Sequence, residues 1–96
     1  MTDQAEIERR LEAAGLRVRG LRWLGGGIAQ DQATGLDQRP YVVINWGAAD
    51  GSVEVQWKYG ASGRWNDADS IAAGKAACEA HHRAQVLALL EVVDDA

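Results

Sequence analysis

The chain has 96 residues and a mass of 10.3 kDa, so we expect residues 1–96 to form a single small domain around one core. Hydrophobic residues make up 47% and charged residues 25%, which is ordinary globular usage and argues against a disordered chain. The formal net charge of −4 argues against a protein whose main task is to neutralise phosphates, although a basic stretch lies at residues 17–22.

The sequence also bears on the compartment. One cysteine, Cys78, leaves no intramolecular disulfide to form and no sign of an oxidising environment. Acidic residues stand near the start, where a secretory signal would need a basic flank and an apolar run. No stretch approaches the roughly 18 to 20 apolar residues that span a bilayer. We therefore expect a cytoplasmic protein with no membrane contact.

The first predicted element is a helix over residues 2–14. Ile7 and Leu11 belong to one narrow apolar stripe at helical spacing, Thr2 or Asp3 can cap the start, and Gly15 can end the helix in the left-handed conformation. A helix so short and so thinly apolar must dock on something larger to persist.

Residues 16–24 alternate apolar and basic side chains and are interrupted at Gly20, which predicts a strand with a bulge. Residues 25–38 open with three glycines and have no periodicity, so we expect a long, mobile loop. The glycine triplet lacks the lysine and the following helix of a phosphate-binding loop, so flexibility is the favoured interpretation.

A β-hairpin is predicted over residues 41–59. Residues 41–46 are rich in β-branched and aromatic side chains, residues 53–59 alternate strictly, and an Asp-Gly pair at 50–51 is typical of a tight reversal. In this hairpin we expect Trp46 to lie close to Trp57.

A second helix is predicted over residues 71–93, with Asp67 or Ser70 as its cap. A helical projection places small side chains along one face, which we expect to cover the hairpin. These side chains are Ala73, Ala76, Ala77, Ala80, Ala84, Leu87 and Ala88.

The predicted fold is therefore α+β, with the order α-β-β-β-α and a three-stranded antiparallel sheet that has two helices packed on one face. The other face would be open and would carry polar side chains together with any tryptophan that the core does not take. Its expected polar residues are Arg17, Arg19, Glu54, Gln56 and Lys58.

A cluster of Cys78, Glu79, His81 and His82 is the strongest candidate for chemistry. Cys78 and His82 share a helical face, but zinc would need two more ligands and the chain has no other cysteine or histidine. A cysteine in the middle of a helix also lacks the surroundings that lower a thiol pKa. We favour a buried thiol with two boundary histidines, and we expect no metal, no cofactor and no enzymatic activity.

The aromatic residues are unusual in kind, because the chain has four Trp and two Tyr but no Phe. Trp, Tyr and Arg dominate contact energies at protein interfaces. We expect at least two tryptophans in the core and at least one exposed for binding. The predicted partner-binding residues are Trp46, Trp57, Trp65, Tyr59, Glu54, Arg17 and Arg19.

The order α-β-β-β-α resembles that of double-stranded RNA-binding domains, whose second helix opens with a cluster of lysines that grips phosphates. The corresponding stretch here, SIAAGKAA at residues 70–77, has Lys75 alone. That departure removes the electrostatic basis for gripping a duplex, so the resemblance carries over the topology and not the activity.

The helix KAACEAHHRA at residues 75–84, preceded by strands rich in Trp and Tyr, resembles the C-terminal part of many small phage and prophage-encoded proteins. The resemblance covers roughly the second half of the chain and implies an accessory protein of a mobile element. Small acidic phage proteins include anti-CRISPR inhibitors, which occlude a nucleic-acid-binding surface on a host complex.

The predicted function is a non-enzymatic module that binds a host or phage protein, in particular a phage-derived inhibitor of a host complex such as a CRISPR effector. One alternative is a nucleic-acid-binding module that uses Arg17, Arg19, Arg22 and Lys58 on the open sheet face. Another is a structural homodimer in which the alanine face of the second helix packs on its symmetry mate.

Overall fold

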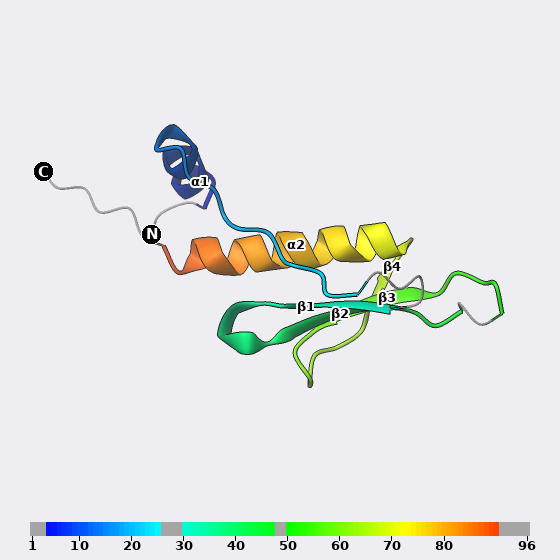
Figure 1. Cartoon of the computed structure of the whole chain (residues 1–96). Coiled ribbons are helices and arrows are strands. Elements are labelled where there is room, and N and C mark those ends of the chain that lie inside the picture. Colours follow the sequence, from blue (N-terminus) through cyan, green and yellow to red (C-terminus); the bar gives the residue numbers. More distant parts are fainter. Residues whose placement is uncertain (1–3, 26–29, 48–49, 91–96) are drawn as a thin grey trace, which may run out of the picture.

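The computed structural model (Figure 1) describes residues 4–25, 30–47 and 50–90. The described residues form an α+β fold with a four-stranded antiparallel sheet in the order β1-β2-β3-β4. Helix α2 lies across one face of this sheet, and helix α1 packs on α2 on the side away from the sheet. The elements are α1 (Gln4–Ala13), β1 (Gln30–Thr34), a short 3-10 helix (Leu36–Gln38), β2 (Pro40–Asn45), β3 (Val55–Tyr59), β4 (Asn66–Ala68) and α2 (Ile71–Ala88).

The predicted hairpin is confirmed as β2 and β3. The two strands pair antiparallel, with Tyr41 opposite Tyr59 and Val43 opposite Trp57. Gly51 in the connection has a φ of 83°, a left-handed conformation that glycine adopts without strain. The local signals were strong here because alternation and turn chemistry both lie within one short stretch of sequence.

The prediction of a strand at residues 16–24 is wrong. This segment crosses from α1 to the sheet and makes only an isolated bridge between Trp23 and Ala33. The edge strand is β1, which lies inside the stretch predicted to be a mobile loop. Its two inward-facing residues, Asp31 and Ala33, are both buried. Because Asp31 is charged, the sequence lacks the alternation of apolar and polar residues that indicates a half-buried strand.

The prediction of three strands is also wrong, because β4 adds a fourth. Its three residues pair with β3, Asn66 opposite Trp57 and Ala68 opposite Val55. Strand β4 is polar and lies directly before α2, so the sequence predicted a helix cap at Asp67 in place of a strand. Only Ala68 packs against the core.

Ser70, one of the two predicted caps, is the N-cap of α2. Its hydroxyl accepts a hydrogen bond from the Ala73 N–H at 3.0 Å. The predicted alanine face is wrong, since five of its six alanines are exposed and the helix buries Gly74 and Cys78 instead; of that face only Leu87 is buried. A Cβ atom on Gly74 would lie 2.7 Å from Cγ1 of Val43. The absence of a side chain at Gly74 therefore allows the helix to lie close against β2.

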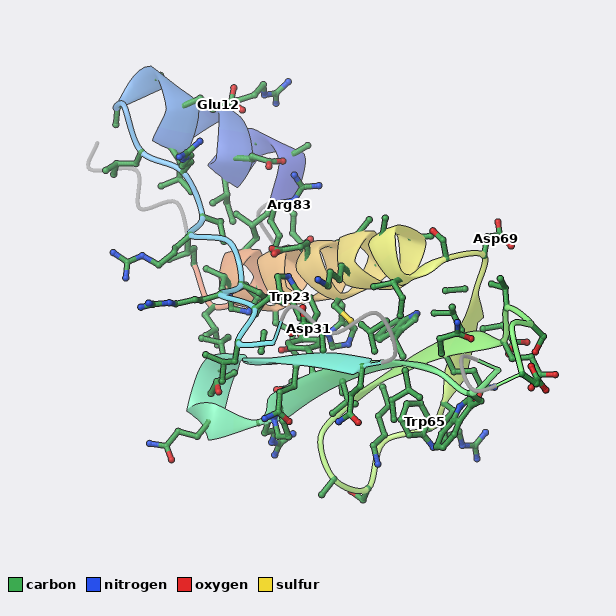
Figure 2. The ribbon with its side chains drawn as sticks, turned by 45° about the vertical axis from the view of Figure 1, so that its right-hand side comes forward. Glu12, Trp23, Asp31, Trp65, Asp69 and Arg83 are labelled. Carbon is green, nitrogen blue, oxygen red and sulfur yellow. The ribbon has the colours of Figure 1, made fainter. Side chains whose placement is uncertain are left out.

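The prediction of two helices on one face of the sheet is therefore corrected: α1 does not lie on the sheet, and among the described elements α2 alone covers it directly. Ile7 is the buried residue of α1, and the Glu8 carboxylate lies 3.4 Å from the Arg83 guanidinium of α2. Figure 2 shows Arg83 on the side of α2 that faces α1. Gly15 ends the helix with a φ of 76°, as predicted, whereas both predicted caps, Thr2 and Asp3, lie outside the described residues.

The core lies between α2 and the inner face of the sheet. Its buried members come from the connecting segment, three strands and the helix: Leu21, Ala33, Tyr41, Val43, Val55 and Cys78. Of the helices in the described part of the chain, none is long and apolar enough to cross a bilayer.

Candidate functional site

Strand alternation divides the side chains of the sheet between two faces. Tyr41 and Val43 of β2 point toward α2 and are fully buried, so Val42 and Ile44 point to the other side. No helix among the described residues covers that side (Figure 1). We call it the open face; by register and alternation it carries Gln30, Gln32, Val42, Ile44, Trp46, Glu54, Gln56, Lys58, Trp65 and Asp67.

Two tryptophans meet on the open face. Trp46 directly follows β2 and Trp65 directly precedes β4; their ring centroids lie 5.3 Å apart at an interplanar angle of 78°. Trp46 is 53% exposed, a large fraction for an indole, and the Lys58 ammonium lies 4.8 Å from the Trp65 ring centroid. In Figure 2, Trp65 lies on the side of the sheet opposite α2.

Gln56 of β3 holds this region in place. Its amide oxygen accepts a hydrogen bond from the Trp46 indole N–H at 3.0 Å, and its amide nitrogen donates to Asp67 Oδ1 at 2.9 Å. One side chain therefore fixes the exposed indole on one side and the β4 carboxylate on the other. Such fixation reduces the side-chain entropy that binding would otherwise remove.

A shallow depression adjoins the exposed indole. We call it the Trp46 depression; its lining residues are Trp46, Val53, Glu54, Val55, Gln56, Asp67 and Ala68. The lining contains two acidic side chains and no basic one. It can therefore offer an aromatic surface and negative charge to a ligand.

Trp57 and Tyr59 do not lie on the open face. Both point toward α2, where their ring centroids lie 6.0 Å and 4.9 Å from that of His81. The predicted contact between Trp46 and Trp57 is absent, because Trp57 pairs with Val43 and the two indoles lie on opposite faces of the sheet. The structure thus separates the predicted aromatic set into a partly buried pair and an outer pair.

Arg17 and Arg19 do not lie on the sheet either. They lie on the segment between α1 and β1, where they line a crevice with Glu79 of α2. The Glu79 carboxylate accepts hydrogen bonds from the Leu21 N–H at 2.9 and 3.1 Å and from the Trp23 indole N–H at 3.3 Å. This segment is thereby anchored on α2, so the two arginines do not join Lys58 in a basic sheet surface.

An ion pair between Asp31 of β1 and Lys75 of α2 was not anticipated from the sequence. The Asp31 side chain is fully buried; its Oδ1 accepts from the N–H groups of Gly25 and Gln32 at 2.7 and 2.8 Å, and its Oδ2 faces the Lys75 ammonium. Burial by itself raises the pKa of Asp31, but Lys75 and the two amides outweigh it and hold that pKa below its ordinary value. Both oxygens are engaged within the fold, which is typical of a structural carboxylate.

The cluster around Cys78 has the character of a core. The Tyr41 hydroxyl lies 2.7 Å from Nδ1 of His81, and burial, followed by the neighbouring Tyr59, raises the pKa of Tyr41 above its ordinary value. Burial, with a smaller effect from Glu79, raises the pKa of the Cys78 thiol to about 12, so the thiol is protonated at neutral pH. Within the residues that the structure describes, no group of three or more His, Cys, Asp or Glu is placed to hold a metal ion.

Comparison of the chain with protein-family models, with curated proteins and with solved structures gave no match.

Proposed function

We propose that this protein is a non-enzymatic module that binds another protein through the open face of its sheet. The observation that carries the proposal is the exposed Trp46 ring, which is held by Gln56 and packed edge-on against Trp65. A preordered, solvent-exposed indole flanked by polar side chains has the composition of an interface hot spot.

The charges around Trp46 favour a protein over a nucleic acid as the partner. Glu54 and Asp67 line the depression, Lys58 lies over Trp65, and Arg17 and Arg19 are on a different part of the molecule. Nucleic-acid binding would require basic groups to neutralise phosphates along the surface that carries the rings.

An inhibitor derived from a phage and acting on a cytoplasmic host complex, such as a CRISPR effector, is the narrower form of this proposal. It rests on the sequence resemblance of residues 75–84 and on acidic side chains suited to a basic, nucleic-acid-binding surface. The homodimer alternative stays a prediction; several of its alanines, among them Ala76 and Ala80, are exposed.

A pull-down from bacterial lysate with matched variants tests the proposal. Trp46→Ala and Trp65→Ala change side chains outside the core, so both variants should keep the circular dichroism spectrum of the wild type. We expect proteins retained by the wild type to be lost with Trp46→Ala and reduced with Trp65→Ala, because truncating a hot-spot indole costs about 2 kcal/mol or more of binding energy.

The control is Leu16→Ala, which removes an apolar side chain that is 58% exposed just after α1, outside the sheet. This variant should retain the same proteins as the wild type. Equal retention by the wild type and by both tryptophan variants would contradict the proposal.

A further inference from the structure

We propose that the Trp46 depression receives an arginine side chain of the partner protein, an inference that rests on the function proposed above. The depression combines an exposed indole with two carboxylates, and its lining has no basic residue to neutralise them. A guanidinium group matches both features, since it stacks on aromatic rings and donates paired hydrogen bonds to carboxylates.

The lining side chains come from adjacent parts of the sheet. The Trp46 N–H donates to the Glu54 carbonyl at 2.9 Å, so these two residues are neighbours across the hairpin. Asp67 of β4 is directly opposite Gln56 of β3, which is two residues beyond Glu54 and on the same face. Backbone pairing therefore positions the indole and both carboxylates around one depression.

The carboxylates retain capacity to bind a ligand. Among the described residues, the Glu54 carboxylate has no hydrogen-bond or ion-pair partner, and Asp67 accepts one hydrogen bond, from Gln56 to Oδ1. Each carboxylate has two oxygens and about four acceptor positions. A partner's guanidinium can thus be shared between the two acids without displacing a contact of the fold.

The neighbouring ring already binds a cation of this chain. Lys58 lies 4.8 Å from the centroid of Trp65, whereas within the described residues no cation lies over Trp46. Trp46 is therefore the ring of the pair that remains available to a cation from another molecule. Arginine suits the site better than lysine because its planar group can lie against the indole and still reach a carboxylate.

The test is a selection of random-sequence peptides displayed on phage against the folded wild-type chain, followed by affinity measurements on the peptides that Trp46→Ala no longer binds. We expect these peptides to share an arginine. Replacing that arginine by citrulline, its neutral isostere, should weaken binding about tenfold, as should Glu54→Gln or Asp67→Asn in the protein.

The citrulline and carboxylate changes should not be additive, because each removes the same contact. Glu12→Gln, an exposed acid on α1, is the control and should leave the affinity unchanged. Raising the salt concentration should weaken the arginine peptide more than the citrulline peptide.

Trp46-dependent peptides that lack a basic residue, or that bind equally well with citrulline, would overturn the arginine inference and leave the proposed function standing. A selection in which no peptide depends on Trp46 would also overturn it. The proposed function itself falls only if the pull-down likewise shows no dependence on either tryptophan.

Discussion

Asp31 shows how one residue escapes prediction and still organises the fold. In the sequence it stands in a polar stretch that is typical of a loop. In the structure it is 2% exposed, and it connects β1 to α2 through Lys75 and to the connecting segment through Gly25. The partner that makes its burial tolerable lies in α2, far along the chain, so no local pattern could reveal it.

Removing Lys75 should therefore be costly. Lys75→Met preserves much of the apolar stem but leaves the Asp31 carboxylate buried with only its two amide donors, which we expect to lower the free energy of unfolding by about 3 kcal/mol. Urea denaturation at neutral pH measures this. Arg22→Met, on an exposed residue of the connecting segment, is the control and should change stability by less than about 0.5 kcal/mol.

The same carboxylate makes stability depend on pH. Because the pKa of Asp31 is lower in the fold than its unfolded value of about 3.9, its contribution is fully present above that value and is lost as the pH falls through the folded pKa. We expect Lys75→Met to reduce the part of the acid destabilisation that comes from Asp31. Urea titrations between neutral pH and about pH 3 would show this, and an unchanged pH slope in the variant would contradict it.

At the scale of elements, short-range sequence patterns correctly predicted the elements that are stabilised by interactions between residues close in sequence. The β2–β3 hairpin follows from alternation and an Asp-Gly turn, and the start of α2 follows from the Ser70 cap. Strands β1 and β4 were missed because tertiary pairing and burial under α2 define them, and neither has the β-branched composition of a typical strand.

The face that α2 turns to the sheet could not be deduced from an alanine-rich sequence, because small side chains give a helix little amphipathic contrast. The structure selects the face with Gly74, Lys75 and Cys78. Gly74 packs closely against Val43, and Lys75 forms an ion pair with Asp31. Cys78 is buried in the core.

Gly74→Ala tests this close approach. Alanine favours a helix by about 1 kcal/mol over glycine, but here its Cβ would meet Val43, so we expect a net loss of about 1 to 2 kcal/mol in the free energy of unfolding. In urea denaturation, the double variant Gly74→Ala with Val43→Ala should lose less free energy of unfolding than the sum of the two single variants, because Val43→Ala removes the side chain that the new Cβ would meet. A stabilised Gly74→Ala variant would mean that α2 does not approach β2 as described.

At the scale of the whole molecule, the described helices cover one face of the sheet and leave the other without a covering helix. The sequence indicated a sheet shielded from one side, and it placed Glu54 and Lys58 on the exposed side correctly. It could not divide the aromatic residues, because the face of Trp46 relative to Trp57 depends on the pairing register, and the position of Trp65 depends on β4.

The arginines were misplaced for a related reason. An alternating basic segment resembles a strand, but Glu79 binds its backbone at Leu21 and holds it over α2, away from the open face. The predicted binding set is therefore distributed over three parts of the molecule. Of that set, the open face unites Trp46, Trp65 and Glu54.

The most direct test of this account is a nuclear magnetic resonance spectrum of the four tryptophan indole N–H groups, assigned with single Trp→Phe variants and recorded with and without the captured partner. We expect the Trp46 and Trp65 signals to shift or broaden on binding, while those of Trp23, bonded to Glu79, and of the inward-facing Trp57 stay in place. Shifts of Trp23 and Trp57 with Trp46 and Trp65 unchanged would place the partner elsewhere and contradict the open face as the binding surface.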